Sequence, residues 1–170
     1  IDTGYSLTEI GYVKIIALMA TIVGVFVGGF LIKQIGLYKS LMIGAVLVMF
    51  TNVLFSFAAI NDKNIFLLSS IVASDSITAG IVGTVNITFL TSLVSTKYTG
   101  FQYALFTSLM AFLGKTFSGF SGILVENFQE IFGFSYGWMS FYVFTSLLAI
   151  PAILLIYLNR NFFIKTDATA

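Results

Sequence analysis

The sequence contains no cysteine and no histidine among its 170 residues. Disulfides, thiolate nucleophiles and imidazole bases are therefore excluded, together with the usual ligands of zinc and haem. An aspartyl protease that works inside a membrane needs two carboxylates that share one site. Only Asp75 lies deep within an apolar stretch, so that route is closed as well. The sequence predicts a protein that is not an enzyme and holds no cofactor or metal.

Charged residues are also scarce, because they make up 9% of the chain against about 25% in a typical soluble domain. The net charge is +1 and no basic cluster is present, so nucleic-acid binding has no electrostatic basis. Hydrophobic residues, in contrast, account for 58% of the chain. This composition predicts a protein whose main partner is the lipid bilayer.

The hydrophobic residues form five long stretches separated by short polar segments. A hydrocarbon core about 30 Å thick needs roughly 20 mainly apolar residues in each spanning helix. The expected spans are approximately residues 9–32, 41–60, 65–94, 101–125 and 138–158. The sequence therefore predicts an all-α fold, a polytopic transmembrane helix bundle, with residues 1–170 forming a single transmembrane domain.

The charges in the connecting segments predict the orientation of the chain. Lysine and arginine accumulate in short loops on the cytoplasmic side of a membrane. The segments after the first, third and fifth spans carry the basic residues Lys33, Lys39, Lys97, Arg160 and Lys165. The alternate segments carry mainly acidic residues, namely Asp2, Glu9, Asp62 (beside Lys63), Glu126 and Glu130. We therefore expect the N-terminus outside the cell membrane and the C-terminus in the cytoplasm.

Two residues of opposite charge lie deep in the expected spans, Asp75 in the third and Lys115 in the fourth. A charge at the bilayer centre costs about 2.5–3.5 kcal/mol on insertion scales and usually faces a partner or water. Helical spacing places Asn86 on the same face as Asp75, and small residues flank both charges. We predict that Asp75, Lys115 and Asn86 line an aqueous or substrate pathway, with the two charges paired or contacting a polar solute. A buried ion pair that only fixes helix packing is the alternative.

Other small or polar residues within the spans predict packing. Gly24, Gly28 and Gly29 form a surface of the GxxxG type, which lets two membrane helices approach closely. Asn52 is expected to form a hydrogen bond to a neighbouring helix. Pro151 lacks a backbone N–H, so we expect it to bend the fifth span.

Several segments of the sequence carry a resemblance to a known family. Residues 4–11 (GYSLTEIG), 98–112 (YTGFQYALFTSLMAF) and 136–158 (YGWMSFYVFTSLLAIPAILLIYL) resemble the C-terminal portion of AmpG-type muropeptide permeases. Residues 28–40 (GGFLIKQIGLYKS) resemble the signature loop of the major facilitator superfamily, except that Gln34 stands where an acidic residue is usual. The resemblance covers essentially the whole chain and keeps the order of the segments.

The resemblance implies a partial major facilitator superfamily C-terminal half, with these spans as the eighth to twelfth helices. Members of the family import anhydro-muropeptides across the bacterial inner membrane, coupled to protons. The resemblance thus implies a polar solute and protons as partners, a multi-pass inner-membrane location and a periplasmic N-terminus. By position, Lys115 resembles a basic residue of the eleventh helix, and Asp75 falls where family members carry polar or acidic residues.

The N-terminal half and the seventh helix of the family have no counterpart in this chain. Alternating access moves two helical halves around a site near the membrane midplane, and five helices cannot form that site alone. A separate chain that supplies the missing helices is therefore an expected partner. The leading function is a portion of a membrane transporter, and the alternative is a truncated, transport-inactive remnant or a membrane assembly partner of the missing half. A third alternative is a small membrane-embedded interaction or signalling subunit, for which no sequence feature argues positively.

Overall fold

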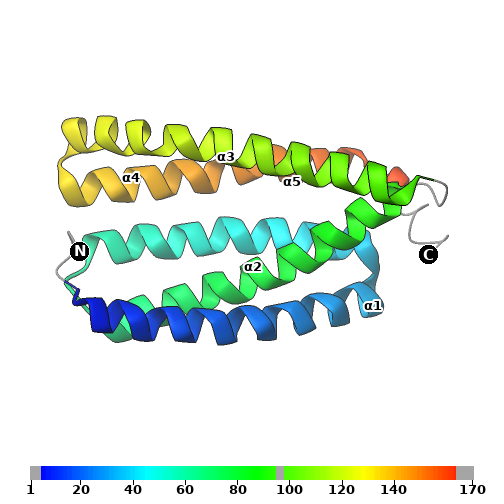
Figure 1. The fold of residues 1–170 in the computed structure, drawn as a ribbon. Helices are drawn as coiled ribbons and strands as arrows, with labels where there is room; N and C mark the ends of the chain where they lie inside the picture. Colours follow the sequence, from blue (N-terminus) through cyan, green and yellow to red (C-terminus); the bar gives the residue numbers. More distant parts are fainter. Residues whose placement is uncertain (1–4, 95–97, 164–170) are drawn as a thin grey trace.

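The computed structural model describes residues 5–94 and 98–163, and in these residues helices are the only regular secondary structure (Figure 1). The helices are α1 (Leu7–Ile60), α2 (Ile65–Leu93), α3 (Thr99–Phe132), α4 (Phe134–Leu147) and α5 (Ala149–Leu158). Four helical stretches are long and apolar enough to cross a membrane, with α4 and α5 counted as one. The predicted class, an all-α transmembrane bundle, is confirmed, whereas the limits of the individual spans stay predictions. Asp2, Lys97 and Lys165, which contributed to the predicted orientation, lie outside the described residues.

Helix α1 is folded back on itself at Gly36, where φ is 81° and ψ is 170°. We call residues 7–35 the first arm and residues 37–60 the second arm. The two arms run in opposite directions (Figure 1). The first arm contains the expected span 9–32, and the second arm contains the expected span 41–60. The first arm begins at a capping box, in which the Ser6 side chain accepts from the Glu9 N–H and the Glu9 carboxylate accepts from the Ser6 N–H.

The turn at Gly36 leads to a first testable prediction. A backbone with φ near +80° and extended ψ is essentially restricted to glycine, because a Cβ atom there clashes with the neighbouring backbone. We therefore expect Gly36→Ala to lower the free energy of unfolding by about 1–3 kcal/mol, measured by denaturation in detergent micelles. Gly11→Ala is the matched control, because a Cβ atom at position 11 would meet no atom within 4 Å. Equal stability of the two variants would contradict the prediction.

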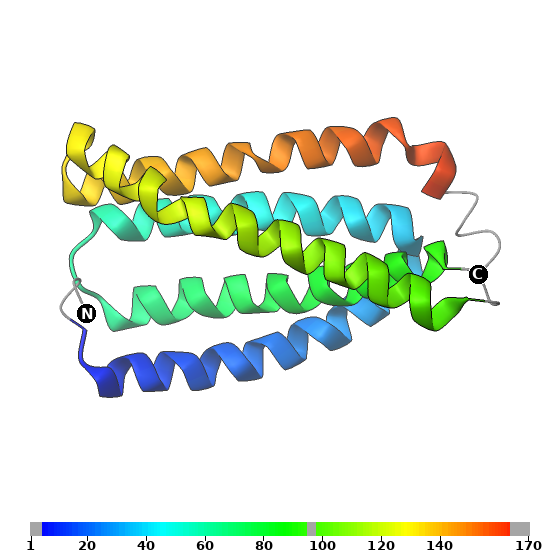
Figure 2. The same cartoon turned by 45° about the horizontal axis from the view of Figure 1, so that its top comes forward.

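Helix α2 lies between the two arms of α1 (Figure 2). A Cβ atom added to Gly24 would collide with the carbonyl of Ile77, and one added to Gly28 would lie 3.0 Å from the Cα of Ile81. The predicted close packing is therefore confirmed for Gly24 and Gly28. It is wrong for Gly29, where an added Cβ would meet nothing within 4 Å, because this residue points away from α2.

The second arm also packs against α4. Thr145 donates a hydrogen bond to Asn52 over 3.2 Å, as expected for a packing asparagine, and Ser146 donates to the Met49 carbonyl over 3.0 Å. The helical hydrogen bonding is interrupted between α4 and α5 at Leu148, because the nearby Pro151 has no N–H to donate to the preceding turn. Leu148 itself keeps helical backbone angles, so the expected bend of the fifth span stays a prediction. The polar contacts hold α4 along the outside of the second arm.

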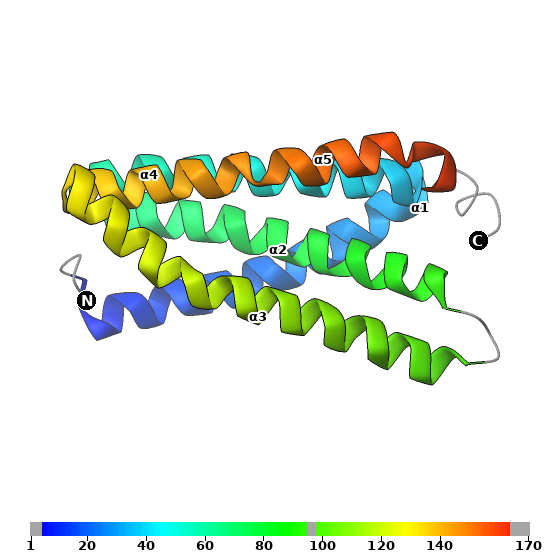
Figure 3. The same ribbon diagram turned by 90° about the horizontal axis from the view of Figure 1, so that it is seen from above.

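Helix α3 has little contact with the other helices. It ends at Gly133, where the chain turns into α4. Away from this turn, α3 diverges from α4 and α5 (Figure 3). Val125 is its only buried residue among those described, and every residue from Ser108 to Phe120 is exposed. We call the end of the bundle where α1 begins and α3 meets α4 the Glu9 end. The Arg160 end is the opposite one, where Gly36 and the end of α5 lie (Figure 1).

Candidate functional site

Asp75 and Asn86 lie on α2, on the side that faces toward α4 and α5. Asp75 is partly buried, and its carboxylate acts electrostatically on Tyr142 of α4. Asn86, also partly buried, lines a cavity of about 240 Å³ between α2, the second arm and α5. The other residues that line this cavity are apolar: Leu41, Gly44, Ala45, Val48, Val82, Val85, Ala149, Ala152 and Ile156. Among the described residues, Asn86 is therefore the one polar side chain that lines this cavity.

Lys115 lies on a different, uncovered surface. It is exposed on α3, and added Cβ atoms at its neighbours Gly119 and Gly122 would meet nothing within 4 Å. It stands 17 residues before Phe132 at the Glu9 end of α3, whereas Asp75 stands ten residues after Ile65 at the same end of α2. At 1.5 Å per residue, these positions correspond to about 26 Å and about 15 Å along the two helices.

The expected ion pair between Asp75 and Lys115 does not form. Within residues 5–94 and 98–163, the one ion pair joins Lys63 and Glu9. The physical reason is that α3 diverges from α4 and α5 (Figure 3) and leaves its middle, where Lys115 lies, exposed. The helix also continues past the expected end of its span to Phe132, which places Lys115 further from the Glu9 end than expected. The pairing was therefore wrong for this arrangement of helices. The wider role of Asp75, Lys115 and Asn86 in a pathway stays a prediction.

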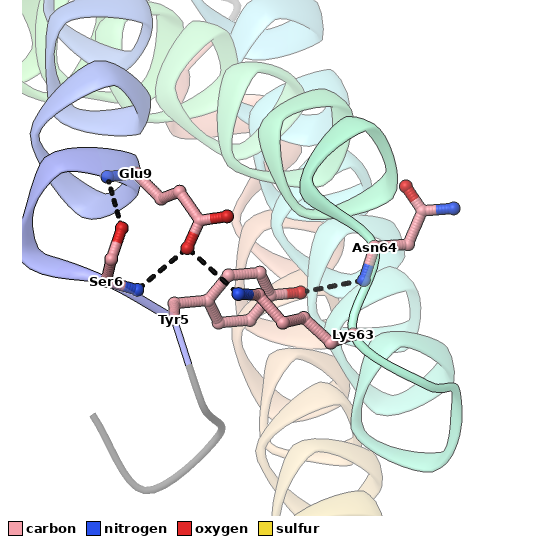
Figure 4. A network of polar contacts seen from close by, with 5 residues as sticks. All are labelled: Tyr5, Ser6, Glu9, Lys63 and Asn64. Carbon is pink, nitrogen blue, oxygen red and sulfur yellow. Dashed lines mark hydrogen bonds and ion pairs between the residues drawn. The ribbon is translucent and has the colours of Figure 1, made fainter.

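A polar network that we did not predict from the sequence lies at the Glu9 end of the bundle (Figure 4). The Glu9 carboxylate accepts from the Ser6 N–H over 2.7 Å and from the Lys63 ammonium over 3.0 Å. The Asn64 N–H donates to the Tyr5 hydroxyl over 3.1 Å, while Lys63 lies 5.0 Å from the centre of the Tyr5 ring. The network ties the beginning of the first arm to the connection between α1 and α2.

Asn64 has a second role, since its side-chain oxygen accepts from the backbone N–H groups of Phe66 and Leu67 and thereby caps α2. The sequence carried a signal for part of this network. A serine followed three residues later by a glutamate, as in Ser6 and Glu9, is typical of a helix start. The long-range contacts of Tyr5 and Lys63 had no comparable signal.

Together, the apolar helices and the polar residues within them define a multi-pass membrane protein. Comparison with known proteins adds homologues that are named as transporters. A protein of Rickettsia bellii named as an AmpG 1 transporter is 32% identical over 158 residues, which is 92% of this chain and 37% of the relative. The anhydromuropeptide permease of Escherichia coli K12 is 28% identical over 160 residues, which is 93% of this chain and 31% of the permease.

A Rickettsia felis protein named as an AmpG 4 transporter is 30% identical over 163 residues, with 95% of this chain and 37% of the relative covered. The chain thus spans about a third of the length of the curated relatives that it matches. No family model matches the chain. No solved structure matches it either.

Proposed function

We propose that this chain is part of a secondary transporter that imports anhydro-muropeptides across the inner membrane of a bacterium. The observation that carries the proposal is the similarity to the Escherichia coli anhydromuropeptide permease along 93% of the chain. The transmembrane bundle supports it, because each apolar stretch is long enough to cross a bilayer. In this proposal the helices correspond to the eighth to twelfth of a major facilitator superfamily fold.

We propose the orientation from the charges at the two ends of the bundle. Lys33, Lys39 and Arg160 belong to the Arg160 end, while Glu9, Asp62 and Glu130 belong to the Glu9 end. The Arg160 end therefore faces the cytoplasm by the rule that positive charge stays inside. The Glu9 end, with the first described residues of the chain, faces the periplasm.

The exposed middle of α3 supports the view that further helices complete the transporter. Lys115 lies at the midpoint of this helix, too far from either end for its side chain to reach the interface. An ammonium group in lipid is costly, and small residues such as Gly119 leave room for a neighbouring helix. We propose that helices from a separate chain, or from the rest of a longer protein, cover this face.

The three intramembrane residues receive distinct roles in the proposed pathway. Asp75 is the proton carrier, because a carboxylate within a span is the group whose charge a proton can switch. Asn86 offers an amide to the solute in an otherwise apolar cavity. Lys115 binds a carboxylate, either of the solute or of a covering helix.

Uptake of radiolabelled anhydro-muropeptide tests the proposal directly. Bacteria that lack their own permease would express this chain alone, or together with the part of the Escherichia coli permease that it does not match. We expect uptake only in the second case, because the chain alone has one half of the pathway. Absence of uptake in both cases, with both parts present in the membrane, would overturn the proposal and favour a transport-inactive assembly partner.

The role of Asp75 gives a prediction in the same assay. Asp75→Asn keeps the size of the side chain but removes the site that binds a proton, so we expect uptake to fall at least tenfold, a loss of about 1.4 kcal/mol. Asp75→Glu should retain most of the activity. Ser74→Ala is the matched control, since the hydroxyl of this neighbour bonds to the Ser70 carbonyl of its own helix. Normal uptake by the asparagine variant would contradict the role.

A further inference from the structure

A second hollow lies at the Glu9 end, separate from the cavity beside Asn86. It has a volume of about 500 Å³, within the range of small-molecule sites. The segment before α1, the end of the second arm, the start of α2 and the start of α4 meet around it. Its lining combines aromatic, aliphatic and polar side chains, which include Phe55, Asp62, Leu68, Ser135, Trp138 and Tyr142. We call this hollow the outer pocket.

Aromatic side chains are prominent in the lining of the outer pocket, and three of them stack on one another. The ring centres of Phe55 and Tyr142 are 5.3 Å apart with an angle of 21° between the planes. The rings of Tyr142 and Trp138 follow at 6.1 Å and 27°. These three rings form a stepped, nearly parallel row, which we call the aromatic row. Aromatic residues at a membrane interface commonly serve as anchors in the headgroup region, but these three line a hollow within the protein.

The polar groups of the outer pocket are available to a ligand. Among the described residues, the Asp62 carboxylate, the Ser135 hydroxyl, the Trp138 indole N–H and the Tyr142 hydroxyl form no hydrogen bond or ion pair. Lys63 is paired with Glu9 over 3.0 Å. The pocket therefore offers one unpaired carboxylate that accepts hydrogen bonds, together with hydroxyl and N–H groups that donate them.

The pocket is also held in shape by the contacts described above. The ion pair of Glu9 with Lys63 and the hydrogen bond from Asn64 to Tyr5 fix two of its walls (Figure 4). The stacking of Phe55 on Tyr142 joins the second arm to α4 and fixes a third. A site that is formed before the ligand arrives loses less conformational entropy on binding.

We propose that the outer pocket binds a saccharide ring of the solute. A pyranose has an apolar C–H face that suits the aromatic row, and hydroxyl groups around its edge that suit Asp62 and Ser135. The choice of solute rests on the proposed function, since anhydro-muropeptides carry amino-sugar rings. The site would then receive solute on the periplasmic side.

The single tryptophan of the chain makes this proposal directly measurable, because Trp138 lines the pocket. The purified protein in detergent, free of added lipid, would be titrated with N-acetylglucosamine while the tryptophan emission is recorded. We expect a saturable change in emission. Asp62→Asn should raise the Kd about tenfold, because it removes the charged acceptor of a hydrogen bond. Asp62 is exposed and forms no ion pair within the described part of the chain, so this variant is expected to remain folded.

Two further variants complete the experiment. Phe55→Leu shortens the aromatic row and should also weaken binding, whereas Tyr157→Phe, at the Arg160 end, should leave the Kd unchanged. A saturable response to phosphocholine but none to N-acetylglucosamine would overturn the proposal in favour of a lipid headgroup. An unchanged Kd in both Asp62→Asn and Phe55→Leu would overturn it as well. Saccharide binding without uptake would contradict the proposed transport function but not the proposed pocket. Uptake without saccharide binding would contradict the proposed pocket but not the transport function.

Discussion

Gly80→Ala is expected to lower the free energy of unfolding of the bundle by about 1–3 kcal/mol, the usual cost of forcing an extra carbon into a filled interface. A Cβ atom at this position would collide with the carbonyl oxygen of Thr21 and lie 2.8 Å from the backbone nitrogen of Val25. Both are backbone atoms of the first arm, so no side-chain rotation can relieve the contact. The helices would have to separate, which would loosen the contacts beside them.

The matched control is Gly83→Ala, three residues further along α2. An added Cβ there would meet no atom within 4 Å, so this variant should be as stable as the parent or slightly more stable, because alanine favours the helix. Thermal unfolding in detergent, followed by circular dichroism, measures the difference between the two variants. If both alanines had the same effect, the close packing of α2 on the first arm would not be the feature that stabilises the bundle.

The glycines at this contact were only partly predictable from the sequence. A GxxxG-type surface predicts that two helices approach closely, and Gly24 and Gly28 do so. The sequence could not tell that Gly29 stands outside the contact, because the rotation of a helix depends on its partner. Gly80 of α2 lies on the other side of this contact, against the backbone of the first arm. The sequence around Gly80 does not indicate which helix it packs against.

The helical class was predictable because the cost of unpaired backbone groups in lipid leaves a spanning chain few alternatives. The interruption between α4 and α5 is a local effect of the N–H that Pro151 lacks, although the sequence predicted a bend rather than an interruption. The relation of Asp75 to Lys115 was not predictable in the same way. Residue number gives the distance of each charge from the end of its helix, but it does not give the direction of α3 relative to the other helices (Figure 3) or the exposure of Lys115.

The outer pocket is the clearest case of information that only the fold supplies. Phe55, Asp62 and Trp138 come from the second arm, the connection to α2 and the start of α4. Taken singly in the sequence, a tyrosine or tryptophan near a span end indicates an interfacial anchor. Their meeting around one hollow depends on the packing of α4 against the second arm, which the sequence does not encode in any short motif.

Lys115→Leu is expected to have effects of opposite sign in the chain alone and in the completed transporter. In the chain alone, Lys115 is exposed at the middle of α3. Its replacement should improve the insertion free energy of this helix by about 2.5–3.5 kcal/mol, the cost of a charge at the bilayer centre. An insertion assay that reports the fraction of α3 crossing the membrane measures this gain. Thr116→Leu is the matched control, because its hydroxyl already bonds to the Phe112 carbonyl and carries no charge.

In cells that also supply the remaining helices, the same leucine should lower uptake of anhydro-muropeptide at least tenfold, since it removes the ammonium from a covered site and leaves its partner unpaired. A gain in insertion together with a loss of transport would indicate that Lys115 makes a contact with a group outside this chain. If Lys115→Leu improved insertion and left uptake unchanged, the lysine would face lipid in the transporter as well, and α3 would need no covering helix at that position.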